Sequence, residues 1–532
     1  MKSAIKKHLL PFLIILSLQP LLPAVDLTLR LMPSYEFPVD NFLNEAGGAA
    51  VNLGLEIAPI TVRGRDKIYA AGLFSYGIFP VESFGIQSLL DGDLALGYNF
   101  RINDRFSVWP EATAGFWSFI SSDTFQAKSS SGISFGGKLG ADFHLSPALS
   151  ISAFGGYKCF YSKPEPFMNN VQAGIGIRYN LTRGLFKPNQ IEMTESEVDS
   201  LFPVFYSHYT DNSFGSLTFV NNEENKITDV EVSVYIDSYM VAPYTVTTIP
   251  VVEMGESFTT PVFAFLNENI LGLLQPKGSD MEVTVSYFSL GKKQETSYSI
   301  PVTALSRNSM TWEDDRRAAA FVSGKDAAAQ TFARQVQAVV KSQLRSDIPE
   351  NLQYAAALFG ALKAFGINYV VDPSSAFTDN VGTASVDFLQ FPYQTLIYHG
   401  GDCDDLTILN CSLLEAIGIE TAFITVPGHI YMAFDSGLSL EQGRQKTSKG
   451  YYIEAEGKIW VPLEITLSQD TFKIAWLYGA REWKKAGENA VLIPLKDAWS
   501  TYLPISVPGS GASIDIPSSD VIIKYFKEAN YY

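Results

Sequence analysis

A cysteine stands where a helix is expected to begin, in the segment Gly400–Leu406. Apolar residues recur at helical spacing directly after it, namely Leu406, Leu409, Leu413 and Ile417. This spacing predicts a helix with one buried face that starts near Cys403. Unpaired backbone N–H groups at a helix N-terminus favour the thiolate form of a cysteine, which is the nucleophilic form. We therefore expect Cys403 to act as a nucleophile.

A base and a carboxylate follow in two strand-like runs. His429 lies 26 positions after Cys403, in the apolar run that begins at Pro427, and Glu464 lies a further 35 positions on, within Trp460–Thr466. In a thiol triad the imidazole takes the thiol proton and the acid holds the ring in the correct orientation. The order of the three residues predicts such a triad, if the fold brings them together.

Three carboxylates, Asp402, Asp404 and Asp405, flank this cysteine. Such a cluster can bind a hard cation such as calcium, or it can cap the N-terminus of a helix, which is the commoner role. His399 precedes the two glycines as a candidate pocket residue, but no second imidazole is near enough in sequence to predict a zinc site. We expect no cofactor and no metal, with calcium at the aspartates left open.

The N-terminus has the layout of a secretory signal peptide over residues 1–24. Three lysines precede a short apolar run, and small or turn-forming residues lead to Ala24. An exported chain with three cysteines keeps at least one thiol free, which suits a catalytic Cys403. Cys411 lies on the same expected helix, and we expect it to be a buried apolar residue without a disulfide.

Residues 25–185 alternate apolar with polar or glycine residues, which is the period of a β-strand. Their length and aromatic ends fit strands that cross a membrane, and eight strands suffice for a barrel filled by its own side chains. The alternative is a soluble antiparallel sandwich or barrel. With an even number of strands the chain enters and leaves the barrel on the same side of the membrane. The later domains would therefore lie in the periplasm. The expected strands are Leu27–Pro33, Ala49–Ile57, Ile68–Ile78, Leu89–Ile102, Phe106–Phe119, Gly132–Leu145, Leu149–Tyr161 and Val171–Leu181.

The middle of the chain contains an acidic stretch and then further short alternating runs. Residues 186–201 are predicted to be a linker because of the acidic run between Ile191 and Leu201. Residues 202–305 have the strand spacing of an immunoglobulin-like β-sandwich, and no group of residues in it predicts chemistry. From Arg316 onward the period becomes helical.

Residues 316–500 resemble the transglutaminase-like branch of the papain-type thiol enzymes. The pieces that carry the resemblance are Gln390–Leu396, Gly400–Leu406, Leu413–Ala422, Pro427–Ile430 and Trp460–Thr466. The resemblance implies an α+β domain in which a helix bearing the cysteine packs on an antiparallel sheet bearing the histidine and the acid. It assigns Cys403 as nucleophile, His429 as base and Glu464 as the orienting acid, with Glu where the family usually has Asp.

The implied chemistry is attack on an amide carbonyl to give a thioester, which water or an amine then resolves. The residues leave peptidase and acyltransferase activity both open. The backbone N–H of Cys403 is the natural oxyanion donor. Further oxyanion or pocket residues are expected near it; the candidates are Gln394, Tyr393, Gly401 and Asp402.

The chain as a whole is therefore expected to have several domains. They are an N-terminal antiparallel β-barrel, a central immunoglobulin-like sandwich, a C-terminal α+β transglutaminase-like domain, and an extension over 501–532. A net charge of −17 argues against nucleic acid as a partner. The expected partners are a protein or peptide substrate, in the cell envelope, and outer-membrane lipid around the barrel. The competing hypothesis is a non-catalytic envelope protein whose C-terminal domain binds peptides.

Overall fold

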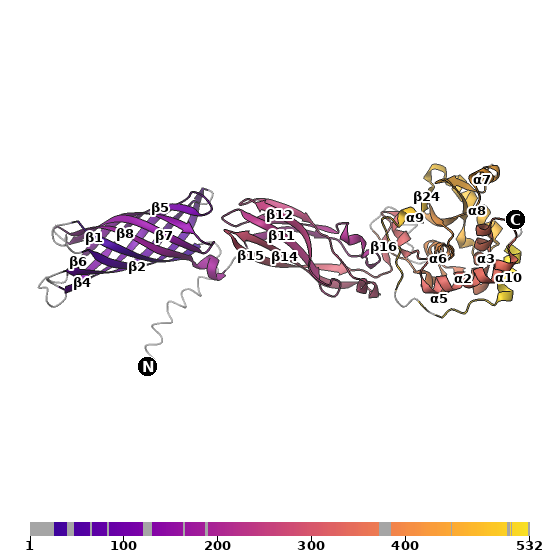
Figure 1. Ribbon diagram of the computed structural model, residues 1–532, viewed down its shortest axis with the longest axis horizontal. Helices are drawn as coiled ribbons and strands as arrows, with labels where there is room; N and C mark the ends of the chain where they lie inside the picture. Colours follow the sequence, from indigo (N-terminus) through magenta and orange to yellow (C-terminus); the bar gives the residue numbers. More distant parts are fainter. Residues whose placement is uncertain are drawn as a thin grey trace, which may run out of the picture.

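The computed structural model describes residues 26–39, 47–63, 66–81, 85–120, 130–162, 165–186, 190–371, 385–447, 450–507, 511 and 513–529. It shows three parts in a row: a barrel, a pair of β-sheets and a domain of helices and strands (Figure 1). The predicted signal peptide lies outside the described residues. None of the described helices has the length and apolar character needed to cross a membrane.

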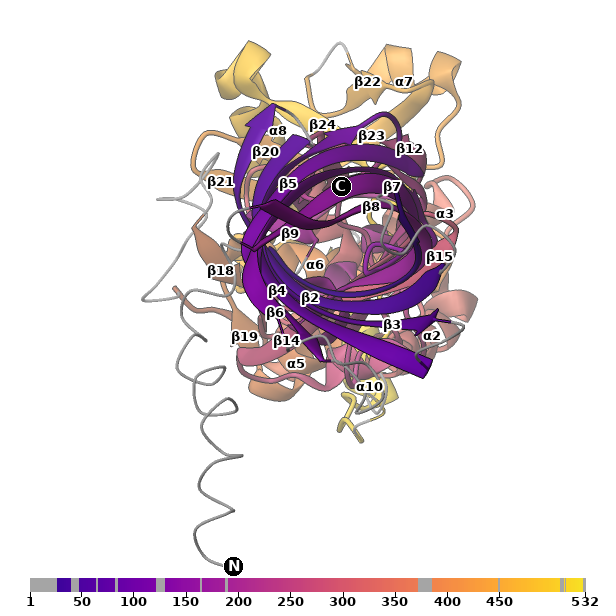
Figure 2. The ribbon, with the colours of Figure 1, turned by 90° about the vertical axis from the view of Figure 1, so that its left-hand side faces the viewer.

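The first part is a closed barrel of eight strands, in which each strand pairs with the next and β1 pairs antiparallel with β8. Seen end-on, the strands encircle the interior (Figure 2). All eight predicted strands are confirmed, most of them longer than predicted. They are β1 (Asp26–Pro38), β2 (Gly48–Arg63), β3 (Asp66–Val81), β4 (Gly85–Arg101), β5 (Phe106–Ile120), β6 (Ser130–His144), β7 (Leu149–Ser162) and β8 (Glu165–Asn180).

The barrel is apolar outside, and its interior holds buried charged groups together with aromatic clusters. Leu94 and Phe116 on the outer wall are 77% and 76% exposed, whereas Arg30 and Glu111 in the lumen are buried. A soluble barrel buries the opposite set, because apolar surface is removed from water on folding. The outward apolar face is typical of a barrel that lies in a bilayer.

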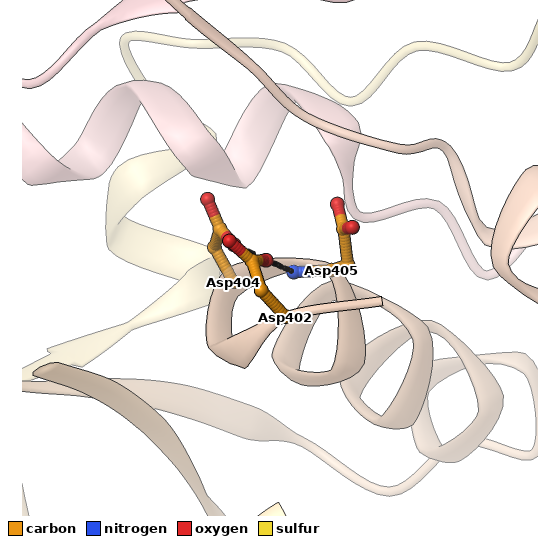
Figure 3. Close-up of side chains that lie close together, drawn as sticks. All are labelled: Asp402, Asp404 and Asp405. Carbon is orange, nitrogen blue, oxygen red and sulfur yellow. Dashed lines mark hydrogen bonds between the residues drawn. The ribbon is translucent and has the colours of Figure 1, made fainter. Parts of the chain in front are cut away.

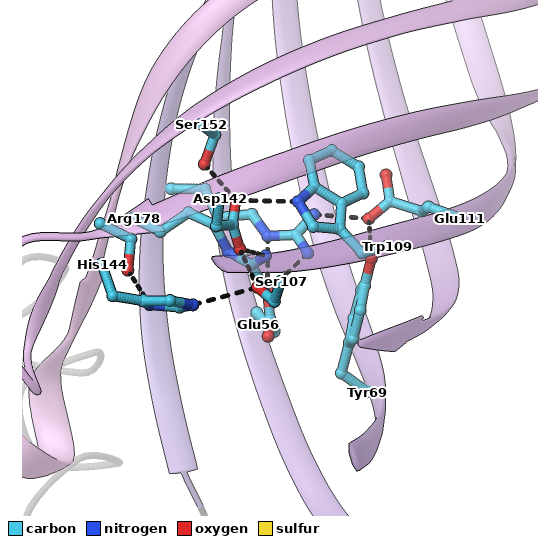
Figure 4. A network of polar contacts seen from close by, with 11 residues as sticks. Glu56, Tyr69, Ser107, Trp109, Glu111, Asp142, His144, Ser152 and Arg178 are labelled. Carbon is cyan, nitrogen blue, oxygen red and sulfur yellow. Dashed lines mark hydrogen bonds and ion pairs between the residues drawn. The ribbon is translucent and has the colours of Figure 1, made fainter. Parts of the chain in front are cut away.

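An ion-pair network fills the lumen of the barrel (Figure 4). Arg30 bridges Glu56 and Glu111 at 2.5 Å each, and Arg178 bridges Asp142 at 2.5 Å and also pairs with Glu56. Each buried charge therefore has an opposite charge beside it, as burial requires. The network explains how a barrel with charged inner faces closes around its own side chains.

Two sheets form the middle part and share one apolar core. The first contains β9 (Ile191–Val198), β10 (Gly215–Asn221) and β13 (Ser257–Pro261); the second contains β11 (Ile227–Ile236), β12 (Tyr244–Val252), β14 (Lys277–Ser289) and β15 (Lys292–Ala304). The alternating runs predicted over 202–305 form strands. The immunoglobulin-like type stays a prediction.

The predicted linker over 186–201 is wrong for half of its length, because β9 is an edge strand of the first sheet. Ile191 at its start is fully buried, whereas Glu192, Glu195 and Glu197 face solvent. Charged side chains are common on edge strands, where they oppose pairing with other chains. The acidic composition therefore reflects an exposed strand and not a linker.

The turn between β10 and β11 docks onto the end of the barrel. Glu224 in this turn pairs with Arg183 at 3.0 Å and also with Lys67, and the neighbouring Asn225 accepts a hydrogen bond from Arg101 at 2.9 Å. The Nη2 atom of Arg105 donates to the backbone oxygen of Leu290 at 2.9 Å. These contacts tie the middle sheets to the barrel end where Asp26 and Asn180 meet.

The C-terminal part combines helices with a five-stranded sheet in the order β22-β23-β21-β20-β24. Its helices are α2 (Ala327–Val340), α3 (Glu350–Phe365), α5 (Pro392–Tyr398), α6 (Cys403–Ala416), α7 (Leu440–Thr447), α8 (Phe472–Ala486), α9 (Leu495–Ala498) and α10 (Ser519–Ala529). Its strands are β16 (Ser309–Thr311), β17 (Asn368–Tyr369), β18 (Val386–Phe388), β19 (Gly400–Gly401), β20 (Thr421–Val426), β21 (His429–Asp435), β22 (Ile453–Ala455), β23 (Lys458–Leu463) and β24 (Val491–Pro494).

Short helical turns complete the chain. They are η2 (Thr182–Phe186), η3 (Pro203–Phe205), η4 (His208–Thr210), η5 (Glu268–Gly272), η6 (Asp315–Phe321), η7 (Lys341–Gln343), η8 (Ile465–Leu467) and η9 (Gly487–Asn489). The predicted extension over 501–532 is not separate where it is described, because α10 packs on α3 and buries Ile522 and Phe526. Tyr502 packs against Phe205 of the middle part with ring centroids 5.4 Å apart, so one continuous core joins the two parts.

Candidate active site

Cys403 is the first residue of α6, as the sequence predicts. Asp402 caps this helix, since its side chain accepts a hydrogen bond from the backbone N–H of Asp405 at 3.4 Å. The Cys403 side chain is mostly covered, with 5% of the residue exposed. The sulfur therefore lies in the first turn of a helix, where free backbone N–H groups favour negative charge.

The two glycines before Cys403 allow another strand to approach closely. Asn368 and Val370 of the β17 segment donate backbone hydrogen bonds to His399 and Gly401, at 3.0 and 2.9 Å. A Cβ atom on Gly400 would lie 2.8 Å from the backbone oxygen of Asn368, and one on Gly401 would lie 2.5 Å from the Cβ of Asp405. Gly400 therefore lets β17 pair beside the nucleophile, and Gly401 leaves room for the side chain of Asp405.

His429 and Glu464 come from neighbouring strands of the five-stranded sheet. His429 begins β21 after the Pro427–Gly428 turn, in which Gly428 has a φ of +76°, and Glu464 directly follows β23. The pairing of β21 with β23 brings the two side chains together. The Nε2 atom of His429 lies 2.8 Å from a carboxylate oxygen of Glu464.

Glu464 is held in place by the turn that follows it. Its second carboxylate oxygen accepts hydrogen bonds from the backbone N–H and the hydroxyl of Thr466, at 3.2 and 2.5 Å. The His429 ring stacks on buried Tyr431 with centroids 5.6 Å apart. The acid and the ring are thus both fixed, which is what an orienting role requires.

The electrostatics of the site link all three residues. Burial disfavours the charged form of His429, but the nearby Cys403 and the hydrogen-bonded carboxylate of Glu464 outweigh it and raise the pKa of the imidazole to about 10. Burial also opposes ionisation of Glu464, yet the contacts with His429 and Thr466 lower the pKa of its carboxyl below the usual value. The predicted residues Cys403, His429 and Glu464 therefore lie close enough to influence one another, and His429 and Glu464 are in direct contact.

The predicted oxyanion residues Tyr393 and Gln394 make other contacts. The Tyr393 hydroxyl accepts a hydrogen bond from Arg307 at 2.8 Å. The side-chain oxygen of Gln394 accepts from the backbone of Phe391 at 2.9 Å and from Asn308 at 2.7 Å. These bonds anchor the start of α5 and do not involve Cys403, so the oxyanion role stays a prediction for both residues.

Tyr369 is a site residue that the sequence did not reveal. Its backbone pairs with Gly401 in the two-stranded β17–β19 ladder, two positions before the nucleophile. Burial, and then the nearby Cys403, Asp402 and Glu464, raise the pKa of its phenol, although 43% of the residue is exposed. Nothing in the sequence signals this pairing, because the two strands are very short and lie about 30 positions apart.

The three carboxylates beside Cys403 lie close together at the start of α6 (Figure 3). The predicted cap is confirmed for Asp402. Asp405 accepts a hydrogen bond from the backbone N–H of Gln390 at 2.7 Å, and burial and the nearby Asp402 raise the pKa of its carboxyl to about 8. The cluster thus fixes the loop before α5 to the first turn of α6.

Replacing Asp405 with Asn should remove a pH-dependent loss of stability. The raised pKa means that the folded chain keeps the proton of Asp405 up to about pH 8, whereas the unfolded chain releases it near pH 4. The stability of the folded chain therefore falls as pH rises from about 4 to about 8. At pH 9 we expect Asp405→Asn to melt at a higher temperature than the wild type, with an unfolding free energy larger by at least ~1.4 kcal/mol. At pH 4 the two proteins should have the same stability. Thermal unfolding at both pH values measures this, with Asp520→Asn at an exposed position as control. A lower stability of Asp405→Asn at pH 9 would contradict the assignment.

Comparisons with known proteins find likeness in the barrel. No protein-family model matches the chain, and no curated protein matches it. Neisserial surface protein A is 12% identical, with 30% of this chain and 97% of that chain covered and a TM-score of 0.24. Ail of Yersinia pestis is 20% identical, with 29% and 97% covered and a TM-score of 0.21. The N-terminal barrel of Pseudomonas aeruginosa OprF is 14% identical, with 29% and 96% covered and a TM-score of 0.20. These scores are low, and the barrel fold is established by its own strand pairing.

Proposed function

We propose that the chain is an outer-membrane-anchored thiol enzyme that acts on amide bonds of proteins or peptides. The observation that carries this proposal is the position of the His429 ring, which hydrogen-bonds to Glu464 and lies near Cys403. A nucleophile beside a base that a third group orients is the arrangement of covalent amide chemistry. The resemblance of residues 316–500 to transglutaminase-like, papain-type enzymes supports the same reading.

In the proposed reaction the Cys403 sulfur attacks the amide carbon, and the carbonyl oxygen becomes an oxyanion near the backbone N–H of Cys403. The carbon–nitrogen bond then breaks, and His429 gives its proton to the departing amine. This leaves a thioester on Cys403. Attack by water gives hydrolysis and attack by an amine gives acyl transfer; in both cases His429 receives the attacking group's proton and the thiol is released.

The outer wall of the barrel supports a location in the outer membrane. Apolar side chains such as Leu94 and Phe116 project outward, and the charged groups lie in the lumen. The two longest connections, between β1 and β2 and between β5 and β6, leave the end opposite the middle sheets. Outer-membrane barrels have short periplasmic turns and longer external loops, so the middle sheets and the enzyme would lie in the periplasm. Proteases added to intact cells should then leave the chain beyond residue 190 uncut.

Arginine in place of Leu94 should destabilise the membrane-inserted barrel by about 2–4 kcal/mol, because the charge would face the hydrocarbon region. Ile102→Arg is the matched control, since Ile102 is also exposed but lies just beyond the end of β4 and should cost ~1 kcal/mol or less. Urea unfolding from lipid vesicles measures both variants. Equal effects at the two positions would argue for a soluble barrel.

An activity screen tests the proposed chemistry. Wild type and Cys403→Ala are incubated with glutamine-bearing and ordinary peptides, with and without an added primary amine, and the products are identified by mass. Cys411→Ala is the control, because Cys411 lies fully buried on the same helix and burial raises the pKa of its thiol. We expect turnover by wild type and Cys411→Ala and none by Cys403→Ala. Turnover that survives in Cys403→Ala would contradict the proposal, and no turnover by the wild type would favour a peptide-binding role.

A further inference from the structure

A polar cavity lies where the rim of the barrel meets the middle sheets. Its volume is about 290 Å³, and it is lined from the barrel side by Leu149, Tyr179 and Arg183 and from the sheets by Glu223, Lys292 and Glu295. The cavity is separate from the candidate active site, which lies in the C-terminal part. No residue of the triad lines it.

The cavity begins where the lipid-facing wall of the barrel ends. Leu149 and Tyr179 are register partners in β7 and β8, and the next pair on the same face is Ile151 with Ile177. Both isoleucines are exposed on the outer wall. A molecule with an apolar tail on this wall would therefore place its polar end in the cavity.

The charges around the cavity are balanced in sign. Arg183 and Lys292 supply two cations, and Glu223 and Glu295 supply two carboxylates. Arg183 pairs with Glu224 at 3.0 Å and with Asp26 at 3.7 Å, whereas no hydrogen bond or ion pair of Lys292 is found among the described residues. The site thus presents both signs of charge within a small volume.

Glu223 is the buried member of this set. It is only 2% exposed, and one carboxylate oxygen accepts a hydrogen bond from the Tyr287 hydroxyl at 3.0 Å. The other oxygen, beside Ser289, has no donor in ordinary hydrogen-bond geometry within the described part of the chain. Burial raises the pKa of this carboxyl, and the nearby Arg183 offsets only part of that increase. A cationic group in the cavity would supply that counter-charge.

We propose that this cavity binds the headgroup of a phospholipid that carries both a phosphate and a primary ammonium, that is, a phosphatidylethanolamine of the inner leaflet. Lys292 and Arg183 contact the phosphate, and Glu223 and Glu295 accept hydrogen bonds from the ammonium. The acyl chains lie against Leu149, Tyr179, Ile151 and Ile177. The inference rests on the proposed location in the outer membrane, and the bound lipid would seat the middle sheets against the membrane surface.

The test uses the full chain in vesicles that contain equal amounts of phosphatidylethanolamine, phosphatidylcholine and phosphatidylglycerol. Insertion is first checked by flotation with the vesicles. The protein is then extracted in mild detergent, and the lipids that remain bound are counted by mass spectrometry. We expect about tenfold enrichment of phosphatidylethanolamine over each other lipid, as two charge-assisted contacts predict. The choline headgroup lacks the N–H donors, and the glycerol headgroup lacks the cation.

Glu295→Gln should reduce this enrichment to about twofold or less, because it removes a carboxylate that accepts from the ammonium, whereas Lys292→Ala should lower the retention of all three lipids, because each carries the phosphate. Lys293→Ala is the matched control: it is the adjacent exposed lysine, it does not line the cavity, and its enrichment should equal that of the wild type. Insertion without lipid preference, or equal loss in Lys293→Ala, would overturn the inference. Failure to float with vesicles would instead overturn the proposed location. Retention of soluble glycerophosphoethanolamine as strongly as the lipid would overturn the assignment to a lipid.

Discussion

Replacing His429 with alanine should lower kcat/KM for amide substrates on the order of 10⁴-fold or more. The imidazole hydrogen-bonds to Glu464 and lies near Cys403, so in the proposed mechanism its removal takes away both the base for Cys403 and the acid for the leaving amine. Steady-state kinetics on the best peptide from the activity screen measure the loss.

His399→Ala is the control for this prediction. The His399 ring stacks on Phe365 with centroids 4.5 Å apart and interacts with the backbone of that residue, outside the triad. We expect this variant to keep most of its activity. Equal losses in the two variants would mean that the effect comes from folding, and an active His429→Ala would remove the imidazole from the mechanism.

Exchange of Glu464 for glutamine should lower kcat/KM by roughly 10²–10⁴-fold and move the alkaline limit of activity to lower pH. The wild type should keep its activity up to about pH 10, because the pKa of His429 is raised to about 10 with Glu464 as one cause. A neutral amide no longer stabilises the imidazolium, so the proton is lost at lower pH. The pH dependence of kcat/KM for both proteins measures the shift.

Glu464→Asp separates charge from geometry in this prediction. It keeps the carboxylate but shortens the side chain that now reaches both His429 and Thr466. We expect its activity to fall while its alkaline limit stays closer to that of the wild type. An unchanged alkaline limit in Glu464→Gln would show that this carboxylate does not act on the imidazole.

The sequence was most informative where a local pattern determines the structure. Alternation in runs such as Leu94 to Ile102 predicted the barrel strands, because one face of each strand meets apolar surroundings and the other meets the lumen. The helix that begins at Cys403 was predicted by its spacing. The meeting of Cys403, His429 and Glu464 depends on pairing across distant strands. Spacing alone does not predict this meeting; the family resemblance was the basis for expecting it.

Other features could not be read from local patterns. The acidic strand β9 looked like a linker, because an edge strand buries few residues and exposes the rest. Tyr369 joins the site through a two-residue ladder in which it pairs with Gly401. A ladder this short has no periodic sequence pattern that could predict it. Tyr393 and Gln394 lie near the nucleophile in sequence, but their partners are Arg307 and Asn308 from the segment before the domain. Pairings between distant segments of this kind are visible only in the folded chain.

The most direct test of the triad is the rate at which iodoacetamide alkylates each cysteine of the folded protein near neutral pH, followed by mass spectrometry. Cys403 beside His429 should react at least about tenfold faster than fully buried Cys411, and His429→Ala should slow Cys403 while leaving Cys411 unchanged. A Cys403 that reacts no faster than Cys411, in a protein whose fold is intact by circular dichroism, would contradict the account and leave a domain that binds peptides without cleaving them.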